Sequence, residues 1–174
     1  MRRAAPLLAA LAAACAHAPP PGAPFAFPDA FEANQLVEIA TADGRREVVA
    51  SLRRRGADFE VTLFDPVFTI PLLSASTRGG DLRVEGSAPG LPEDAGPQLL
   101  ALLADLYGRT FRAVGADRLE ARSRRFAYAL LGVRPRDGCP FPDRIEVSPR
   151  RGAALHLRVV TIDVSCVGPS AAGR

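Results

Sequence analysis

Side chains that could do chemistry are few in this chain, and their spacing builds no catalytic set. Three serines lack the Gly-x-Ser-x-Gly turn that presents a nucleophile: Ser74, Ser76 and Ser87. His156 falls on the polar side of an alternating strand pattern, which favours a solvated residue over a general base. Asp65 stands before a proline and Asp163 near the C-terminus, positions that favour a turn former and a strand-end residue. We therefore expect that the protein is not an enzyme.

Residues 1–16 resemble the export signal of a bacterial lipoprotein. Arg2 and Arg3 form a basic start, residues 4–14 form a short apolar run, and Cys15 follows three alanines. The run is too short to span a membrane. The resemblance implies a lipid thioether on Cys15, cleavage before it and acylation of the new amino terminus, although Ala12 stands where the motif usually has leucine. The alternative is an ordinary cleaved secretory signal with an incidental cysteine.

The residues after Cys15 indicate where such an anchor is delivered. Ala16 stands where retention in the inner membrane would need aspartate, so the resemblance implies an outer-membrane lipoprotein that faces the periplasm. The proline-rich segment that follows is typical of an extended tether. We therefore divide the chain into a signal peptide (1–14), a lipidated tether (15–30), one domain (31–167) and a disordered tail (168–174).

The charge balance argues against one class of partner. The chain has 22 basic and 19 acidic side chains, and cleavage of residues 1–14 removes Arg2 and Arg3, which leaves a nearly neutral mature protein. Nucleic-acid binding requires a clustered basic excess. We therefore expect no nucleic-acid partner, and we expect a monomer.

Cys139 and Cys166 remain after lipidation, in a compartment that oxidises thiols. The segment between them has the pattern of a hairpin that turns at residues 149–152, which brings Cys139 within a few positions of Cys166. We predict that they form a disulfide, which contributes about 3 kcal/mol in the chain-entropy model. No Cys-x-x-Cys spacing or histidine cluster accompanies them, so we expect no metal and no cofactor.

From residue 35 onward, apolar residues alternate with polar ones, which is typical of half-buried strands. Turn-forming residues separate the runs. The runs lie at residues 37–39, 47–53, 58–63, 68–72 and 82–84. Pro71 indicates an edge or a bulge in the fourth run. The pattern predicts an antiparallel meander with one dry face.

One amphipathic helix interrupts the strands. Its leucines recur at helical spacing: Leu99, Leu102, Leu103 and Leu106. Pro97 suits the first helical position and Gly108 the stop. Further strands are predicted at residues 118–123 and 126–131, joined by a tight turn or a bulge, and a hairpin of residues 143–163 ends the fold. The sheet is long enough to curl into a barrel or half-barrel.

A helix on the concave side of such a sheet admits two interiors. One is a filled core, as in most packed proteins. The other is an apolar cavity, for which the pattern predicts this lining: Val61, Leu63, Phe68, Ile70, Leu72, Leu99 and Leu103.

Arginines at predicted turns also have two interpretations. Arg53–Arg55 and Arg150–Arg151 fall on hairpin tips, where they either meet lipid phosphates or form a charged turn in water. The same alternatives apply to Arg122, Arg124 and Arg125.

The order of these elements resembles the superfamily of the periplasmic lipoprotein carrier LolA and its outer-membrane receptor LolB, in particular short lipoproteins related to LolB. The likeness covers residues 31–165 and rests on element order and on these segments: FDPVFTIPLL (64–73), GGDLRVEG (79–86), the leucine helix, RFAYALL (125–131) and FPDRIEVSPRRGAALHLRVVTIDV (141–164). It implies a mainly β fold with one or two helices, in which a curled antiparallel sheet forms an unclosed β-barrel with a helical lid over an acyl-binding cavity. Two features differ from those families: the loop near Asp65 is short, and tryptophan is absent.

Two functions follow from these expectations. The first is an outer-membrane-anchored lipoprotein that binds acyl chains or a lipidated protein in its cavity and helps their transfer or insertion in the cell envelope. The second is a structural or interaction lipoprotein with a filled core and no ligand. In both, the acyl anchor contacts the inner leaflet of the outer membrane.

Overall fold

The computed structural model describes residues 23–42, 44–86, 93–151 and 155–167. The predicted signal peptide, Cys15, the first half of the tether (15–22) and the C-terminal tail therefore lie outside the described residues. Within these ranges, no helix is long and apolar enough to cross a membrane.

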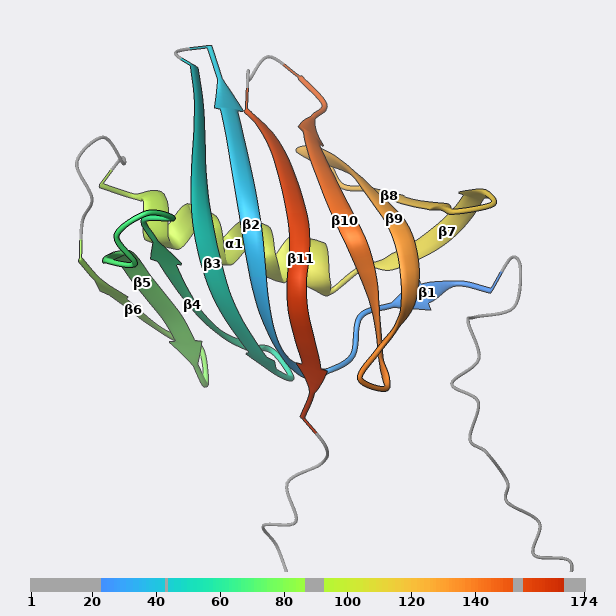
Figure 1. The fold of residues 1–174 in the computed structure, drawn as a ribbon, viewed down its shortest axis with the longest axis horizontal. Coiled ribbons are helices and arrows are strands. Elements are labelled where there is room, and N and C mark those ends of the chain that lie inside the picture. Colours follow the sequence, from blue (N-terminus) through green and yellow to red (C-terminus); the bar gives the residue numbers. More distant parts are fainter. Residues whose placement is uncertain (1–22, 43, 87–92, 152–154, 168–174) are drawn as a thin grey trace, which may run out of the picture.

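The described residues form a single antiparallel sheet of 11 strands with one helix (Figure 1). The strands are β1 (Phe25–Ala26), β2 (Ala30–Thr41), β3 (Gly44–Arg55), β4 (Asp58–Phe64), β5 (Pro71–Arg78), β6 (Asp81–Glu85), β7 (Thr110–Gly115), β8 (Arg118–Arg122), β9 (Phe126–Arg136), β10 (Cys139–Pro149) and β11 (His156–Cys166). Their order is β1-β7-β8-β9-β10-β11-β2-β3-β4-β5-β6. The sheet curls, but β1 and β6 at its two edges do not pair with each other, so the barrel is open and the predicted fold class is confirmed.

The long central strands follow from the alternation of the sequence. β2 and β3 pair from Ala30 opposite Arg55 to Thr41 opposite Gly44, so every second residue of both strands faces the concave side. β11 adds to the free edge of β2 and joins the C-terminal hairpin to the start of the domain. These strands form the wall on which the interior is built.

The predicted strand at residues 68–72 is wrong, because the chain turns there instead. The Asp65 carboxylate accepts hydrogen bonds from the backbone N–H groups of Val67 (2.8 Å) and Phe68 (2.9 Å), which folds residues 65–70 into a loop. β5 begins only at Pro71, opposite a register shift between Leu63 and Phe64, so of the two alternatives for this proline the bulge is correct.

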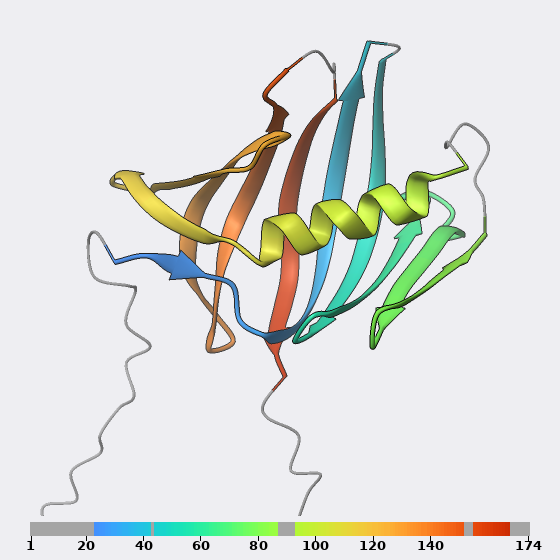
Figure 2. The ribbon, with the colours of Figure 1, turned by 180° about the vertical axis from the view of Figure 1, so that it is seen from behind.

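The helix α1 (Ala95–Tyr107) crosses the concave face of the sheet, as Figure 2 shows. It begins two residues before the predicted start, so Pro97 is its third residue, where an N–H group has no intrahelical partner in any case. Gly96 lies against Val84 of β6 so closely that an added Cβ would stand 2.7 Å from the valine Cγ1. The lack of a side chain at Gly96 therefore lets the helix start on the edge of the sheet.

Two other segments refine the predicted boundaries. The chain turns tightly at Ser123–Arg125, where the Ser123 N–H donates to the Phe126 carbonyl at 2.8 Å, so the tight turn is correct rather than the bulge. The fold also begins earlier than residue 31. Phe25 pairs with Phe111 in β1 and β7, and Phe25 and Phe27 are both buried, so the last part of the predicted tether belongs to the domain.

An aromatic cluster fills one end of the half-barrel. Phe27, Phe31 and Phe141 pack with ring centroids 5.0 to 6.5 Å apart, and the Tyr107 ring at the end of α1 lies 4.6 Å from that of Phe27. Phe111 is fully buried beside them. This end of the interior is a solid core, which leaves the space farther along the helix to be considered.

Candidate functional site

An open cavity of about 1350 Å³ lies between α1 and the concave face of the sheet. Apolar side chains make up most of its wall. From the sheet they are Val37, Ile39, Val48, Ala50, Leu52, Val61, Leu63, Leu73, Phe126, Val147, Leu157 and Val159, from the residue before β11 Leu155, and from the helix Ala95, Pro97, Leu99, Ala101, Leu102, Leu103 and Leu106. The interior therefore combines both predicted alternatives, a filled aromatic end and a hollow apolar remainder.

Four of the predicted lining residues are in place. Val61 and Leu63 of β4 line the cavity on the sheet side, and Leu99 and Leu103 of α1 line it on the helix side. The helical and strand periods that predicted these four residues are both regular here, so each side chain points inward.

The other three predicted lining residues do not line the cavity. Phe68 and Ile70 are 73% and 57% exposed, because the Asp65 loop replaces the expected strand. Leu72 is half-buried and packs against the core from a position beside the cavity. Leu73 points inward in its place, because it pairs with the inward-facing Leu63 of β4.

Most of the lining that the prediction missed comes from central strands. These lining residues include Val37 and Ile39 of β2, which flank the outward Glu38, and Val48 and Ala50 of β3, which lie between Glu47 and Ser51. Their alternation was visible in the sequence and could have assigned them to the dry face. What the sequence did not show is that α1 would lie over these strands rather than to one side.

A buried polar pair marks the inner end of the cavity. Gln35 is 3% exposed and lines the cavity next to Tyr107, whose hydroxyl donates a hydrogen bond to the Gln35 Oε1 atom at 3.2 Å. Burial raises the pKa of the Tyr107 hydroxyl, so it remains a proton donor. The Gln35 Nε2 atom has no hydrogen-bond partner within the described part of the chain.

Behind this pair, Arg54 connects the helix to the sheet. Its Nη1 donates to the Tyr107 carbonyl oxygen at 2.8 Å and to the Pro28 carbonyl at 3.2 Å, and its Nε donates to the Gly56 carbonyl at 3.0 Å. Arg54 is also buried. The interpretation of Arg53–Arg55 as a tip that meets phosphates is therefore wrong for this residue. Arg53 pairs with Glu32 and Glu60 on the outer face.

Asp105 is a charged group on the helix side of the cavity. Its carboxylate accepts hydrogen bonds from Arg109 and from the Tyr128 hydroxyl. Burial acts to raise the pKa of this carboxyl, but the hydrogen bonds from Arg109 and Tyr128 outweigh it, so the pKa is lowered. The ionised carboxylate fixes the last turn of α1 to β9.

Arginines surround the opening of the cavity. Five line it: Arg45, Arg46, Arg109, Arg124 and Arg125. Arg45 pairs with Glu38 and Arg109 pairs with Asp105. Arg46, Arg124 and Arg125 are exposed, and their side chains make no ion pair with any residue that the structure describes.

The candidate catalytic groups are not brought together. Asp65 holds a turn, Asp163 accepts hydrogen bonds from Asn34 on the surface, and His156 is exposed beside Ser148. In the described ranges, no group of three or more His, Cys, Asp or Glu side chains could hold a metal ion. The structure places Cys139 and Cys166 in a disulfide with Cα atoms 5.1 Å apart, at the end of the hairpin.

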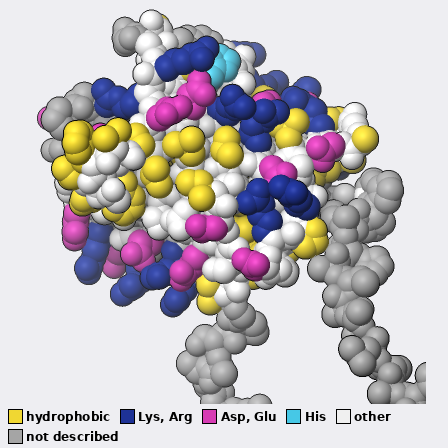
Figure 3. Space-filling model, in the orientation of Figure 1, with side chains coloured by type: hydrophobic (Ala, Val, Ile, Leu, Met, Phe, Trp, Pro, Cys, Tyr) yellow, Lys and Arg dark blue, Asp and Glu magenta, His cyan; other side chains and the backbone are white. Residues whose placement is uncertain are grey.

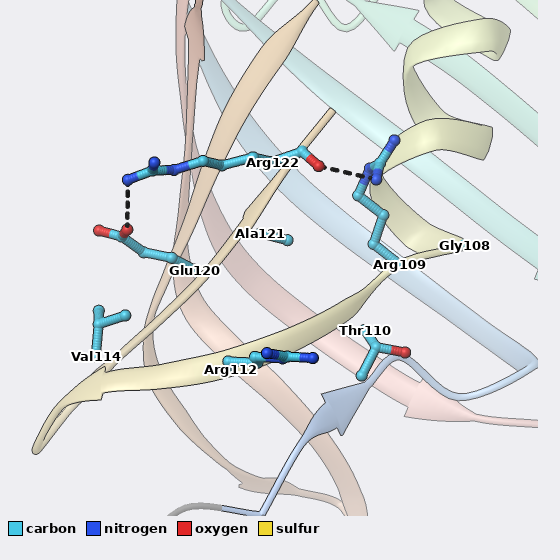
Figure 4. A pocket seen from close by; sticks show the side chains of 8 residues that line it. All are labelled: Gly108, Arg109, Thr110, Arg112, Val114, Glu120, Ala121 and Arg122. Atoms are coloured by element: carbon cyan, nitrogen blue, oxygen red, sulfur yellow. Dashed lines mark hydrogen bonds and ion pairs between the residues drawn. The ribbon is translucent and has the colours of Figure 1, made fainter. Parts of the chain in front are cut away.

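A second, smaller cavity of about 520 Å³ lies beside β7 and β8 (Figure 4). Arg109 donates to the Arg122 carbonyl at 3.1 Å there, and Arg122 approaches Glu120 at 3.8 Å. Its wall mixes charged side chains with apolar ones such as Val114 and Ala121, and the described residues that line it include no histidine, cysteine or serine. The large apolar cavity is therefore the candidate site.

Comparison with solved structures agrees with this architecture. A LolA superfamily protein from Nitrosomonas europaea matches with a TM-score of 0.52 over 83% of this chain and 89% of that one, at 12% sequence identity. The chain has the LolA-like fold. No family model matches the sequence, and no curated protein matches it significantly. At this identity the match concerns the fold alone, and the site described above is this chain's own.

Proposed function

We propose that this protein binds acyl chains of lipids or lipidated proteins in the cavity under α1 and helps transfer them within the cell envelope. The cavity carries the proposal: it has about 1350 Å³ of largely apolar space. This exceeds the roughly 300–1,000 Å³ of common small-molecule pockets. An apolar space of this size suits long hydrocarbon chains, since each sheltered methylene contributes about 0.8 kcal/mol.

The position of α1 supports a lid. Its main contacts are with β4, β5 and β6 at one edge of the sheet, and the cavity separates it from the middle strands. Motion of the helix away from β2 and β11 would leave the strand pairing intact, although it would have to break the hydrogen bonds that join Tyr107 to Gln35 and to Arg54. Such a motion would admit and release an acyl chain.

The loop between β4 and β5 supports a membrane step. Val67, Phe68 and Ile70 are exposed by 76%, 73% and 57%, and the Asp65 turn holds them outward. Exposed apolar side chains grouped on one loop are typical of contact with a membrane or a partner. In the proposed cycle these three side chains enter the lipid surface while the cavity releases its bound acyl chain.

Cavity binding can be tested by filling the space. Ala50 is buried in the cavity wall, and Ala50→Phe would occupy room that an acyl chain needs. Ala113→Phe makes the same change on an exposed residue of β7 outside the cavity. We expect Ala50→Phe to lower the affinity for a fluorescent fatty-acid probe by at least tenfold, and Ala113→Phe to leave it unchanged.

The second candidate, a structural lipoprotein without ligand, would be supported by the opposite result. Wild-type protein that takes up no acyl probe and copurifies with no lipid in native mass spectrometry would contradict the carrier proposal. Equal probe binding by both phenylalanine variants would place the lipid elsewhere than in this cavity.

The anchor belongs to the same proposal. Cys15 and the segment before it resemble a lipoprotein signal, which would attach the domain to the inner leaflet of the outer membrane. Growth with labelled palmitate should label the full chain, and Cys15→Ser should remove the label. Fractionation of envelope membranes should then find the acylated protein in the outer membrane. Palmitate labelling that persists in Cys15→Ser would contradict the assignment.

A further inference from the structure

Three turns of the sheet meet at the open end of the cavity. β11 begins with His156 opposite Ala40 of β2, so the β10–β11 connection ends beside the last residues of β2. Arg150 in that connection makes two hydrogen bonds to the β8–β9 turn. Its backbone N–H donates to the Arg125 carbonyl at 2.9 Å, and its side-chain Nη1 donates to the Ser123 carbonyl at 3.0 Å. Sheet pairing and these hydrogen bonds therefore hold the three turns together.

Each of these turns carries arginine. Arg46 lies at the start of β3, opposite Ile39, on the side that faces the cavity. Arg124 and Arg125 occupy the β8–β9 turn across the opening. Figure 3, which looks onto the outer face of the sheet, shows dark-blue basic side chains beside the cyan histidine at the end of the molecule where these turns lie.

Among the residues that the structure describes, the arginines that line the cavity outnumber the carboxylates that line it. The described lining carboxylates are those of Asp94 and Asp105; Asp105 is bound to Arg109, and Asp94 accepts a hydrogen bond from Gln98. The charges of Arg46, Arg124 and Arg125 are therefore not paired with any described carboxylate, and these side chains lie at the boundary between an apolar space and water. A guanidinium group matches phosphate oxygens with paired N–H donors.

We infer that the ligand is an acyl lipid with an anionic phosphate head group, whose chain lies under α1 and whose phosphate is bound by Arg46, Arg124 and Arg125. This inference rests on the proposed function, because it needs an acyl chain in the cavity. It adds a selection rule: zwitterionic and uncharged lipids with the same chain bind less well.

The test compares three palmitoyl lipids in monomeric form. They are lysophosphatidylglycerol, which is anionic, lysophosphatidylcholine, which is zwitterionic, and monopalmitoylglycerol, which is uncharged. Each displaces a fluorescent fatty-acid probe from the wild-type domain. We expect the anionic lipid to bind about tenfold more tightly than the other two, a preference that shrinks as salt rises because screening weakens the phosphate contact.

Two triple variants separate the opening from overall charge. Arg46→Gln, Arg124→Gln and Arg125→Gln together should abolish the preference while the uncharged lipid binds as before. Arg83→Gln, Arg112→Gln and Arg158→Gln remove the same charge from exposed residues outside the large cavity, and should keep the preference.

The other outcomes each decide a different point. Equal binding of all three lipids by the wild-type domain would overturn the head-group inference and leave the proposed function standing. If none of the three lipids binds, both the head-group inference and the proposed function are contradicted. If the opening variants lose only their binding to phosphatidylglycerol vesicles and keep the preference among monomeric lipids, the arginines contact a bilayer and not the bound ligand, which also overturns the inference.

Discussion

Arg54 of β3 donates a hydrogen bond from its Nη1 to the carbonyl oxygen of Tyr107, the last residue of α1, at 2.8 Å. The contact satisfies a carbonyl that has no partner within the helix and places a positive charge at the negative end of the helix dipole. Through the Pro28 and Gly56 carbonyls, the same guanidinium also holds the segment before β2 and the β3–β4 turn. One buried side chain therefore positions the closed end of the cavity.

Replacing Arg54 should destabilise the domain strongly. In Arg54→Met, the Tyr107, Pro28 and Gly56 carbonyls would lose a buried donor, so we expect the free energy of unfolding to fall by about 2–4 kcal/mol. Arg54→Lys should recover only part, since an ammonium group cannot reproduce the planar fork. Urea denaturation measures both, with Arg55→Met as the exposed control. A loss below about 0.5 kcal/mol in Arg54→Met would contradict this role.

Gln35 and Tyr107 should be coupled energetically. Tyr107→Phe removes the donor to the Gln35 Oε1 atom and leaves a buried amide without any partner, which should cost about 1–3 kcal/mol. Gln35→Leu leaves the tyrosine hydroxyl unpaired at a similar cost. The double variant removes the whole polar pair, so it should be more stable than the sum of the single losses predicts. A double-mutant cycle in urea measures the coupling, and strictly additive losses would contradict it.

The Asp105 carboxyl should make stability depend on acid pH. Its pKa is lowered in the folded state from an ordinary value of 3.8, so the folded protein binds fewer protons than the unfolded chain in that range. The stabilisation is fully present above about pH 4 and is lost as the pH falls through the lowered folded-state pKa. Denaturation midpoints measured from pH 7 to pH 2 should fall less steeply at acid pH in Asp105→Asn than in the wild type. Parallel curves would show that Asp105 does not contribute.

The Cys139–Cys166 disulfide should stabilise the C-terminal hairpin against the rest of the sheet. It links residues 27 positions apart in sequence, so the chain-entropy model predicts about 3 kcal/mol. Cys139→Ala with Cys166→Ala should lower the free energy of unfolding by this amount, and reduction of the wild type should do the same. The stability of the double alanine variant should not change when reductant is added. An unchanged stability on reduction would contradict the prediction.

Much of the fold could be predicted because its period is local. Ala50 and Leu52 alternate with the polar Ser51 and Arg53 whatever their partners are, and the leucines of α1 recur at helical spacing. The hairpin pattern alone also predicted that Cys139 lies near Cys166. The short strand β7 was missed, since Thr110–Gly115 has a single buried residue, Phe111, and no clear alternation.

The candidate site could be predicted only in part. Phe68 and Ile70 have the same types as buried strand residues, and the Asp65 side chain decides that they face solvent. Within β5, Leu73 pairs with the inward-facing Leu63, and Leu72 is the residue skipped where the register shifts, so Leu73 lines the cavity and Leu72 does not. A shift of one residue reverses the face of a strand, so small errors of register change which residues line a cavity.

By itself the sequence determined the kind of elements, because apolar spacing acts within a few residues of the chain. An antiparallel sheet, one amphipathic helix and an apolar inner face all follow from that spacing. Only the tertiary structure decided that the interior is filled at the aromatic end and hollow beyond Gln35. It also decided that Arg54 is buried whereas Arg46 stays at the opening. A hollow space and a buried charge both depend on partners that are distant in the chain, and local periodicity carries no information about them.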